Sequence, residues 1–438
     1  MFDSKNQPAI AAAPLGARRR SSGMIVLLCF LTITFDGYDL VVYGTTIPSI
    51  LGYDAWNISP STVGLIGSLT SFGLLIGALS AGSLSARFGA RAVMVGSIIS
   101  FSSMMGFAAL APNPEVFALV RFLGGLGLGA VMPTAISLTV EYSRRERRNL
   151  NNALMFSGYA VGAILASGTA IVVLPQLGFR WMYAIGLIPL LLVPAIWRVL
   201  PESRVYLIAQ GRRSEADHLT EQYGLDDAAV RTRSQTDRSM RQLLARTHAL
   251  PLALFTVATF CGLLVIYGVN TWLPNIMREA GYSLGMSLTF LATLNAGAIV
   301  GGITGSVVAD RIGSKIPAVI AFSIATTSTI LISTGLPTAG LFVVVAMLGM
   351  GTTGTQIVVT GWVATYFPDA LRTGAIGFVL GLGRLGAIAG PAIGGWITAS
   401  ALGHQWNYYT FAAFAVTGAV AMFLVPLTRT ESTRHTPQ

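Results

Sequence analysis

Apolar and polar residues alternate along this chain in long blocks. Runs of roughly 20 or more mostly apolar residues, long enough to cross a bilayer as helices, are separated by short polar stretches. Twelve such runs lie near residues 24–50, 62–84, 90–111, 115–141, 151–175, 180–200, 250–276, 285–308, 316–336, 340–366, 373–399 and 408–428. The pattern predicts an all-α membrane protein with twelve transmembrane helices.

A polar segment divides the twelve runs into two sets of six. Residues 201–249 hold eight arginines and seven acidic residues and contain no apolar run of spanning length. We therefore expect a tail at 1–23, a six-helix half at 24–200, a linker at 201–249, a second half at 250–428 and a tail at 429–438. The composition agrees, because 53% hydrophobic residues, 11% charged residues and a mean hydropathy of +0.66 are typical of a polytopic membrane protein.

Lysine and arginine are distributed unequally between the two sets of alternate loops. Outside the linker, sixteen lie on one set of loops and the tails, and two lie on the opposite loops. Basic residues favour the cytoplasmic side, so we expect the linker and both termini to be cytoplasmic, in a bacterial inner membrane. The net charge of +10 then reflects topology and gives no reason to expect a nucleic-acid partner. The sixteen are Lys5, Arg18, Arg19, Arg20, Arg87, Arg91, Arg144, Arg145, Arg147, Arg148, Arg198, Arg311, Lys315, Arg372, Arg429 and Arg434, and the two are Arg180 and Arg278.

The two halves are related in sequence. When the chain is compared with itself at an offset of 224 residues, "VVYG" at 41–44 coincides with "VIYG" at 265–268, and "ARFGAR" at 86–91 coincides with "DRIGSK" at 310–315. One ungapped offset that aligns patches in several helices indicates a duplicated six-helix unit. Parallel repeats of this kind occur in a large class of transporters, whose substrate site lies near the bilayer midplane between the halves.

Three motifs give the repeat a specific resemblance. "GSLSARFGAR" at 82–91, "DRIGSK" at 310–315 and "LPESRVYL" at 200–207 resemble the loop signatures of the major facilitator superfamily. The resemblance implies two pseudo-symmetric six-helix halves and gating charges beside the loops, but Ala86 stands where the superfamily usually has an acid, whereas Asp310 is retained. The gating candidates are Arg87, Asp310, Arg311 and Arg372, although the positive-inside rule alone also explains the charge of Arg372.

Three further motifs narrow the resemblance. "DGYD" at 36–39, "RFLGGLGLGAVMP" at 121–133 and "GRLGAIAGP" at 383–391 are similar to segments of the aromatic acid/proton symporters. The resemblance implies import of an aromatic carboxylate with protons, and it makes Arg121 and Glu141 candidates for proton transfer or gating. Both residues bracket the fourth apolar run, so the alternative is that they are boundary charges whose side chains reach the membrane interfaces.

Two aspartates lie deep in the first apolar run. Asp36 and Asp39 are three residues apart and share a helical face, and a helix that begins near Met24 places Asp36 ~18 Å along its axis, near the bilayer midplane. Charges at that depth usually face a bundle interior or an ion pathway. Burial and a like charge one turn away both favour protonation, so we expect at least one of the two to carry the coupled proton. The alternatives are that they cap a helix break at Gly37 or pair permanently with an arginine.

Arg384 is a cation deep within another apolar run, where it requires a counter-charge. Its planar guanidinium matches a carboxylate in two-point fashion, so we expect it to bind the substrate carboxylate. A standing ion pair with Asp36 or Asp39 is the alternative. The glycines around it, at 386, 390 and 394, recur every four residues and favour close helix packing.

Aromatic side chains near the expected cavity are candidates for stacking on a ring-shaped substrate. They are Tyr38, Tyr43, Tyr267 and Trp362, each of which can equally be a core residue. We find no catalytic constellation and no metal-ligand spacing, so we expect neither an enzyme nor a cofactor.

The sequence favours a proton-coupled symporter that imports an aromatic carboxylate such as benzoate or hydroxybenzoate by alternating access, and that functions as a monomer in the lipid bilayer. In the expected cycle, protonation of an aspartate releases Arg384 to the substrate. The alternatives are a symporter for another organic acid or a sugar, a proton-driven exporter, or a transporter-like sensor.

Overall fold

The structure, a computed structural model, describes residues 22–144, 147–225, 246–403 and 405–426. The expected tails at 1–23 and 429–438 and the middle of the expected linker therefore lie wholly or almost wholly outside the described residues. Within the described ranges, twelve spans are long and apolar enough to cross a membrane, which confirms the predicted fold class. Eleven are single helices: α1 (Gly23–Leu51), α2 (Pro60–Phe88), α3 (Ala90–Leu110), α4 (Pro114–Glu141), α5 (Arg148–Leu177), α11 (Arg246–Glu279), α12 (Leu284–Ile312), α13 (Lys315–Ile332), α14 (Thr338–Tyr366), α15 (Asp369–Ala399) and α16 (Gln405–Leu424).

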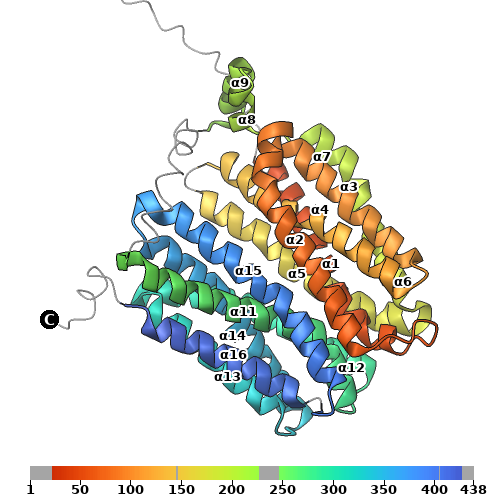
Figure 1. Ribbon diagram of the computed structural model, residues 1–438. Helices are drawn as coiled ribbons and strands as arrows, with labels where there is room; N and C mark the ends of the chain where they lie inside the picture. Colours follow the sequence, from red (N-terminus) through yellow and green to blue (C-terminus); the bar gives the residue numbers. More distant parts are fainter. Residues whose placement is uncertain (1–21, 145–146, 226–245, 404, 427–438) are drawn as a thin grey trace, which may run out of the picture.

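The sixth span is divided into three pieces. It comprises α6 (Phe179–Ala184), the 3₁₀ segment η2 (Ile185–Leu192) and α7 (Val193–Val199). Pro189 lies inside the 3₁₀ segment, and proline lacks the N–H that an α-helix requires at that position. Two short helices follow, α8 (Arg204–Ala209) and α9 (Arg213–Tyr223), and both lie at one end of the bundle (Figure 1). We refer to that end as the linker face and to the other end as the opposite face.

Glycine contacts repeat between the halves with the predicted offset. A Cβ at Gly73 would lie 2.3 Å from the carbonyl oxygen of Phe122, where α2 crosses α4. In the second half, a Cβ at Gly297 would lie 2.1 Å from the carbonyl oxygen of Ala346, where α12 crosses α14. Both residues of the second pair are 224 positions beyond those of the first, so the duplicated unit is a duplicated packing arrangement. Only glycine permits so close a backbone approach.

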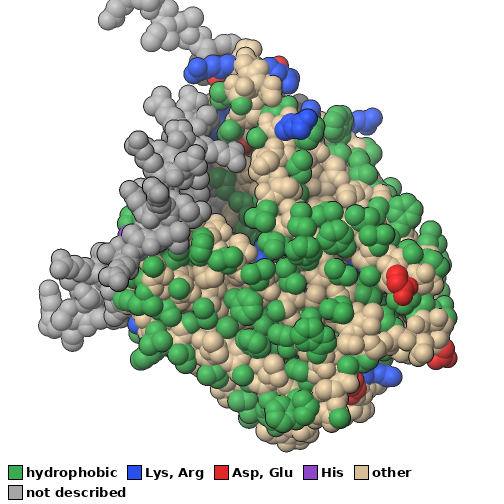
Figure 2. Space-filling view, in the orientation of Figure 1, with side chains coloured by type: hydrophobic (Ala, Val, Ile, Leu, Met, Phe, Trp, Pro, Cys, Tyr) green, Lys and Arg blue, Asp and Glu red, His purple; other side chains and the backbone are tan. Residues whose placement is uncertain are grey.

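The two halves are in close contact toward the opposite face. The hydroxyl of Ser68 in α2 donates a hydrogen bond of 2.6 Å to the carbonyl oxygen of Ile388 in α15. A Cβ at Gly64 would lie 2.6 Å from the carbonyl oxygen of Pro391, and one at Gly44 in α1 would lie 2.2 Å from that of Asn270 in α11. At the linker face the surface is instead hollowed between the halves (Figure 2). The bundle is therefore closed at the opposite face.

Exposed apolar side chains cover the flanks of the bundle, whereas charged side chains gather toward its two ends (Figure 2). Leu79, Leu119 and Leu191 are examples with more than half of their surface exposed. An apolar flank between two charged ends is the surface that a bilayer-spanning bundle requires.

Candidate functional site

Asp36 and Asp39 are both buried on α1, each with 2% of its surface exposed. The helix is continuous from Gly23 to Leu51, so neither aspartate caps a break. Gly37 between them has a packing role, because a Cβ there would lie 2.1 Å from the carbonyl oxygen of Tyr159 in α5. The close approach of α5 encloses this part of α1.

Asp39 forms a buried ion pair with Arg121 of α4, within the first half. The Nη1 group of Arg121 donates to Asp39 Oδ1, and the side chains are 4% and 2% exposed. The guanidinium also lies 5.6 Å from the ring centre of Tyr43 and 5.7 Å from that of Tyr183. Paired charges and cation–π contacts are what allow two ions to be buried together. Arg121 is therefore the counter-charge of Asp39, a partner that helical spacing alone did not reveal.

Asp36 belongs to a different group, which joins the two halves. The charge of Arg384 in α15 acts on Asp36, and both charges act on the hydroxyl of Tyr267 in α11. The charge of Asp36 also acts on the hydroxyl of Tyr159 in α5. Helices of both halves thus contribute to this group, as expected for a site between the halves. Tyr159 and Tyr183 lie in apolar runs without a motif, so no signal in the sequence singles them out.

Arg384 forms no ion pair with either aspartate among the described residues. Its Nη1 atom is buried and has no hydrogen-bond partner. A standing pair between Arg384 and an aspartate, the alternative raised from the sequence, is thus absent from this arrangement. A buried guanidinium N–H group without a partner can donate a hydrogen bond to an anion from outside the chain.

The candidate aromatic residues occupy three different environments. Tyr38 donates its hydroxyl to the carbonyl oxygen of Met182 at 2.9 Å, and Tyr43 donates to that of Val63, so both hydroxyls are bonded within the first half. Trp362 is fully buried and its ring lies 5.0 Å from that of Phe255, inside the second half. Tyr267 is the candidate whose hydroxyl is affected by the charge of Arg384.

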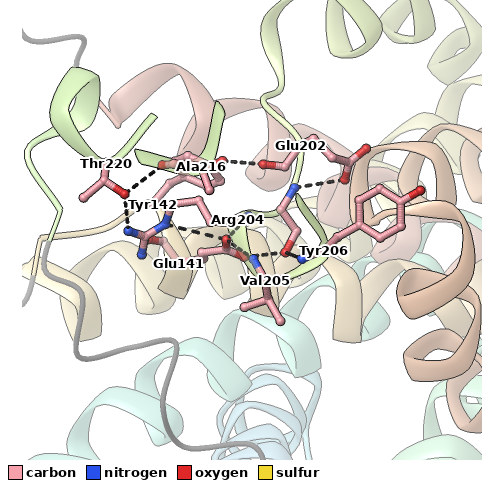
Figure 3. A network of polar contacts seen from close by, with 9 residues as sticks. Glu141, Tyr142, Glu202, Arg204, Val205, Tyr206, Ala216 and Thr220 are labelled. Carbon is pink, nitrogen blue, oxygen red and sulfur yellow. Dashed lines mark hydrogen bonds and ion pairs between the residues drawn. The ribbon is translucent and has the colours of Figure 1, made fainter. Parts of the chain in front are cut away.

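Glu141 lies at the end of α4, beside α8 at the linker face (Figure 3). Its carboxylate accepts hydrogen bonds from the Ser203 hydroxyl at 2.9 Å and from the backbone N–H of Arg204. The Nε of Arg204 lies 3.7 Å from the same carboxylate. Arg204 in turn donates to the Thr220 hydroxyl at 3.0 Å. Glu141 therefore attaches α8 and α9 to the first half.

Glu202 supplies an acid beside the loop that lacks one at Ala86. Its carboxylate accepts the backbone N–H of Arg91 at 3.1 Å and lies 3.9 Å from the Nε of that arginine. Its carbonyl oxygen accepts the Tyr142 hydroxyl. A Cβ at Gly89 would lie 2.6 Å from its carboxyl carbon. Glu202 lies within the motif "LPESRVYL" at 200–207, but the motif by itself does not predict this contact.

The gating candidates lie at the linker face and are exposed to solvent. The guanidinium of Arg87 lies 5.3 Å from the ring centre of Phe88. Asp310 and Arg311, at the end of α12, take part in no ion pair within the described part of the chain. Arg372 lies in the first turn of α15. The gating role of these residues stays a prediction.

The sequence model of the Major Facilitator Superfamily matches residues 29–354 and 296–438, which is most of the chain. The chain belongs to the Major Facilitator Superfamily. The superfamily resemblance predicted from the loop motifs is thereby confirmed.

Curated relatives within the superfamily resemble the chain over most of its length. It is 37% identical to the gentisate transporter of Corynebacterium glutamicum, covering 94% of this chain and 89% of that protein. It is 33% identical to the benzoate transport protein of Acinetobacter baylyi, covering 92% and 89%. Among solved structures, a partially occluded inward-open conformation of the Escherichia coli xylose transporter XylE has a TM-score of 0.74 at 17% identity, covering 93% and 100%. The last similarity shows the shared superfamily fold.

Proposed function

We propose that the chain is a proton-coupled symporter that imports an aromatic carboxylate by alternating access. The observation that carries the proposal is the unpartnered, buried Nη1 of Arg384 in a group that also contains Asp36 and joins the two halves. The names of the curated relatives, which transport gentisate and benzoate, support an aromatic acid as the cargo.

Arg384 binds the substrate carboxylate in this proposal. A guanidinium group presents parallel N–H donors to a carboxylate, and hydrogen bonds between charged groups are shorter and stronger than neutral ones. In this binding mode the substrate ring lies beside Tyr267, whose hydroxyl is affected by the charge of Arg384. An aromatic contact of this kind adds affinity without requiring a further charge.

Asp36 carries the coupled proton, and Asp39 is structural. Asp39 is held by Arg121, so its protonation would leave a buried cation without a counter-charge. Asp36 has no ion pair in the described part of the chain, and protonation there removes a buried charge at little structural cost. The difference between the two aspartates follows from their partners, because both are equally buried.

The transport cycle follows from these assignments. The distribution of basic residues supports a cytoplasmic linker face in a bacterial inner membrane, so in this proposal the arrangement closed at the opposite face is the inward-facing one. In the outward-facing arrangement, a proton neutralises Asp36 and the substrate carboxylate neutralises Arg384. A site with both cargoes has no unpaired charge, and it can be enclosed between the halves at much lower electrostatic cost than an empty one.

Uptake into proteoliposomes tests the proposal. An inward proton gradient should drive accumulation of radiolabelled benzoate or gentisate by the parent protein, and a protonophore should abolish it. Asp36→Asn should bind the acid but not accumulate it, whereas Asp54→Asn, at an exposed loop position, should behave as the parent. Accumulation driven by sodium alone, or normal accumulation by Asp36→Asn, would contradict the coupling. Transport of xylose in place of any aromatic acid would contradict the substrate class.

A further inference from the structure

Two side chains of the second half carry buried polar atoms without hydrogen-bond partners. Both amide atoms of Gln356 in α14 and the hydroxyl of Thr259 in α11 are in this state. Threonines in helices of this chain commonly return a hydrogen bond to the carbonyl four residues earlier, as Thr256 does to Leu252 at 2.7 Å. Thr259 lacks that bond although it is fully buried. Buried polar groups are normally satisfied by protein, water or ligand.

The two groups lie at one level of the second half, beside the turn that carries Arg384. A Cβ at Gly262 would lie 3.0 Å from Gln356 Oε1, so the amide rests where α11 has no side chain. A Cβ at Gly383 would lie 2.3 Å from Cγ2 of Thr259, so the side chain of Thr259 packs directly against the backbone of Gly383. Thr259 and Gly262 are three residues apart on one helical face, ~4.5 Å along the axis. Along the axis of α11, the amide, the hydroxyl and the turn bearing Arg384 therefore lie within about one helical turn.

The chemistry of these atoms complements a neutral hydroxyl group. An amide offers both donors and an acceptor, and a threonine hydroxyl offers both as well. A carboxylate can only accept hydrogen bonds, and it has its own partner in Arg384. A phenolic hydroxyl both donates and accepts, so it can satisfy the amide of Gln356 on its two sides. The ring of Phe322, whose Cζ would lie 3.6 Å from a Cβ at Gly262, provides an apolar wall beside the amide.

We propose that Gln356 and Thr259 recognise a ring hydroxyl of the substrate, so that the transporter selects hydroxylated aromatic acids over unsubstituted benzoate. This inference rests on the proposed function and adds to it the residues that determine specificity. A site whose buried polar groups are satisfied only by the substrate hydroxyl discriminates against an analogue that lacks this group, because binding that analogue leaves them unpaired.

Calorimetric titration of the purified full-length protein tests the inference. The ligands are benzoate, 3-hydroxybenzoate and 4-hydroxybenzoate, and the proteins are the parent, Gln356→Met, Thr259→Val and Thr256→Val. We expect the parent to bind at least one hydroxylated acid about tenfold or more tighter than benzoate. Gln356→Met should abolish that preference and change benzoate affinity less than twofold, and Thr259→Val should reduce the preference. Thr256→Val should keep the preference, because the hydroxyl that it removes is bonded to the backbone of its own helix in the parent.

The melting temperature without ligand provides a second measurement. Gln356→Met replaces an unpaired buried amide with an apolar side chain of similar length, so the ligand-free protein should melt no lower than the parent. A lower melting temperature together with equal loss of affinity for all three acids would show that Gln356 is a structural residue and would overturn the inference. Unchanged ligand preference in Gln356→Met would also overturn it. Failure of the parent to bind any of the acids would overturn the proposed function itself.

Discussion

Replacing Asp39 with asparagine should destabilise the protein much more than the same replacement of Asp36. Asp39 is the counter-charge of Arg121, and that guanidinium is 4% exposed with an Nε that already lacks a hydrogen-bond partner. Removing one member of a buried ion pair costs about 3–5 kcal/mol, because the other charge remains buried and unpaired. Asparagine keeps a carbonyl acceptor for Arg121, so we expect a loss of about 3 kcal/mol, at the lower end of that range.

Asp36→Asn provides the matched comparison. Both aspartates are on α1 and are equally buried, but Asp36 has no ion pair in the described part of the chain. Its replacement removes a buried charge and leaves no cation of the first half unpaired, so the stability should be equal to or greater than that of the parent. The difference in the free energy of unfolding between the two variants therefore measures the effect of the Asp39–Arg121 ion pair.

Reversible chemical unfolding in detergent micelles, followed by circular dichroism, measures this difference. The double variant Asp39→Asn/Arg121→Gln completes the cycle and should be more stable than the sum of the single losses predicts, because it leaves no unpaired ion. Equal loss in Asp36→Asn and Asp39→Asn, or strictly additive losses in the double variant, would refute the assignment of Arg121 to Asp39.

Three other outcomes are expected. Arg384→Ala should weaken binding of the aromatic acid by one to two orders of magnitude, because hydrogen bonds to charged groups contribute about 1.5–3 kcal/mol each. Calorimetry should show unchanged binding of the uncharged amide analogue, whereas equal loss for both ligands would contradict a carboxylate site. Glu141→Gln should increase hydrogen exchange across α8 while benzoate affinity stays within twofold, and unchanged exchange would show that the carboxylate does not anchor that helix. Asp310→Asn should slow counterflow more than Ala86→Asn does, whereas equal rates would remove any special gating role from the retained acid.

The membrane made much of the fold predictable from the sequence. In a bilayer every backbone polar group must be bonded within its own segment, so a long apolar run has few alternatives to a helix. The predicted run at 115–141, for example, corresponds to α4 at Pro114–Glu141. The packing of the helices follows the same repeat, since close helix crossings require glycine at corresponding positions. Gly73 and Gly297 preserve both the offset and the contact.

The partner of each buried charge was decided only by the tertiary structure. Helical spacing showed that Asp36 and Asp39 share a face of α1, but a face does not specify the helix packed against it. The bundle directs Asp39 toward Arg121 in the same half and places Asp36 in the group that contains Arg384. The sequence of an apolar run gives little information about which helix packs against it, because lipid tails and the apolar side chains of a second helix are almost equally apolar surroundings. The choice among arginines depends on which helices cross at that depth, and this is a property of the assembled bundle.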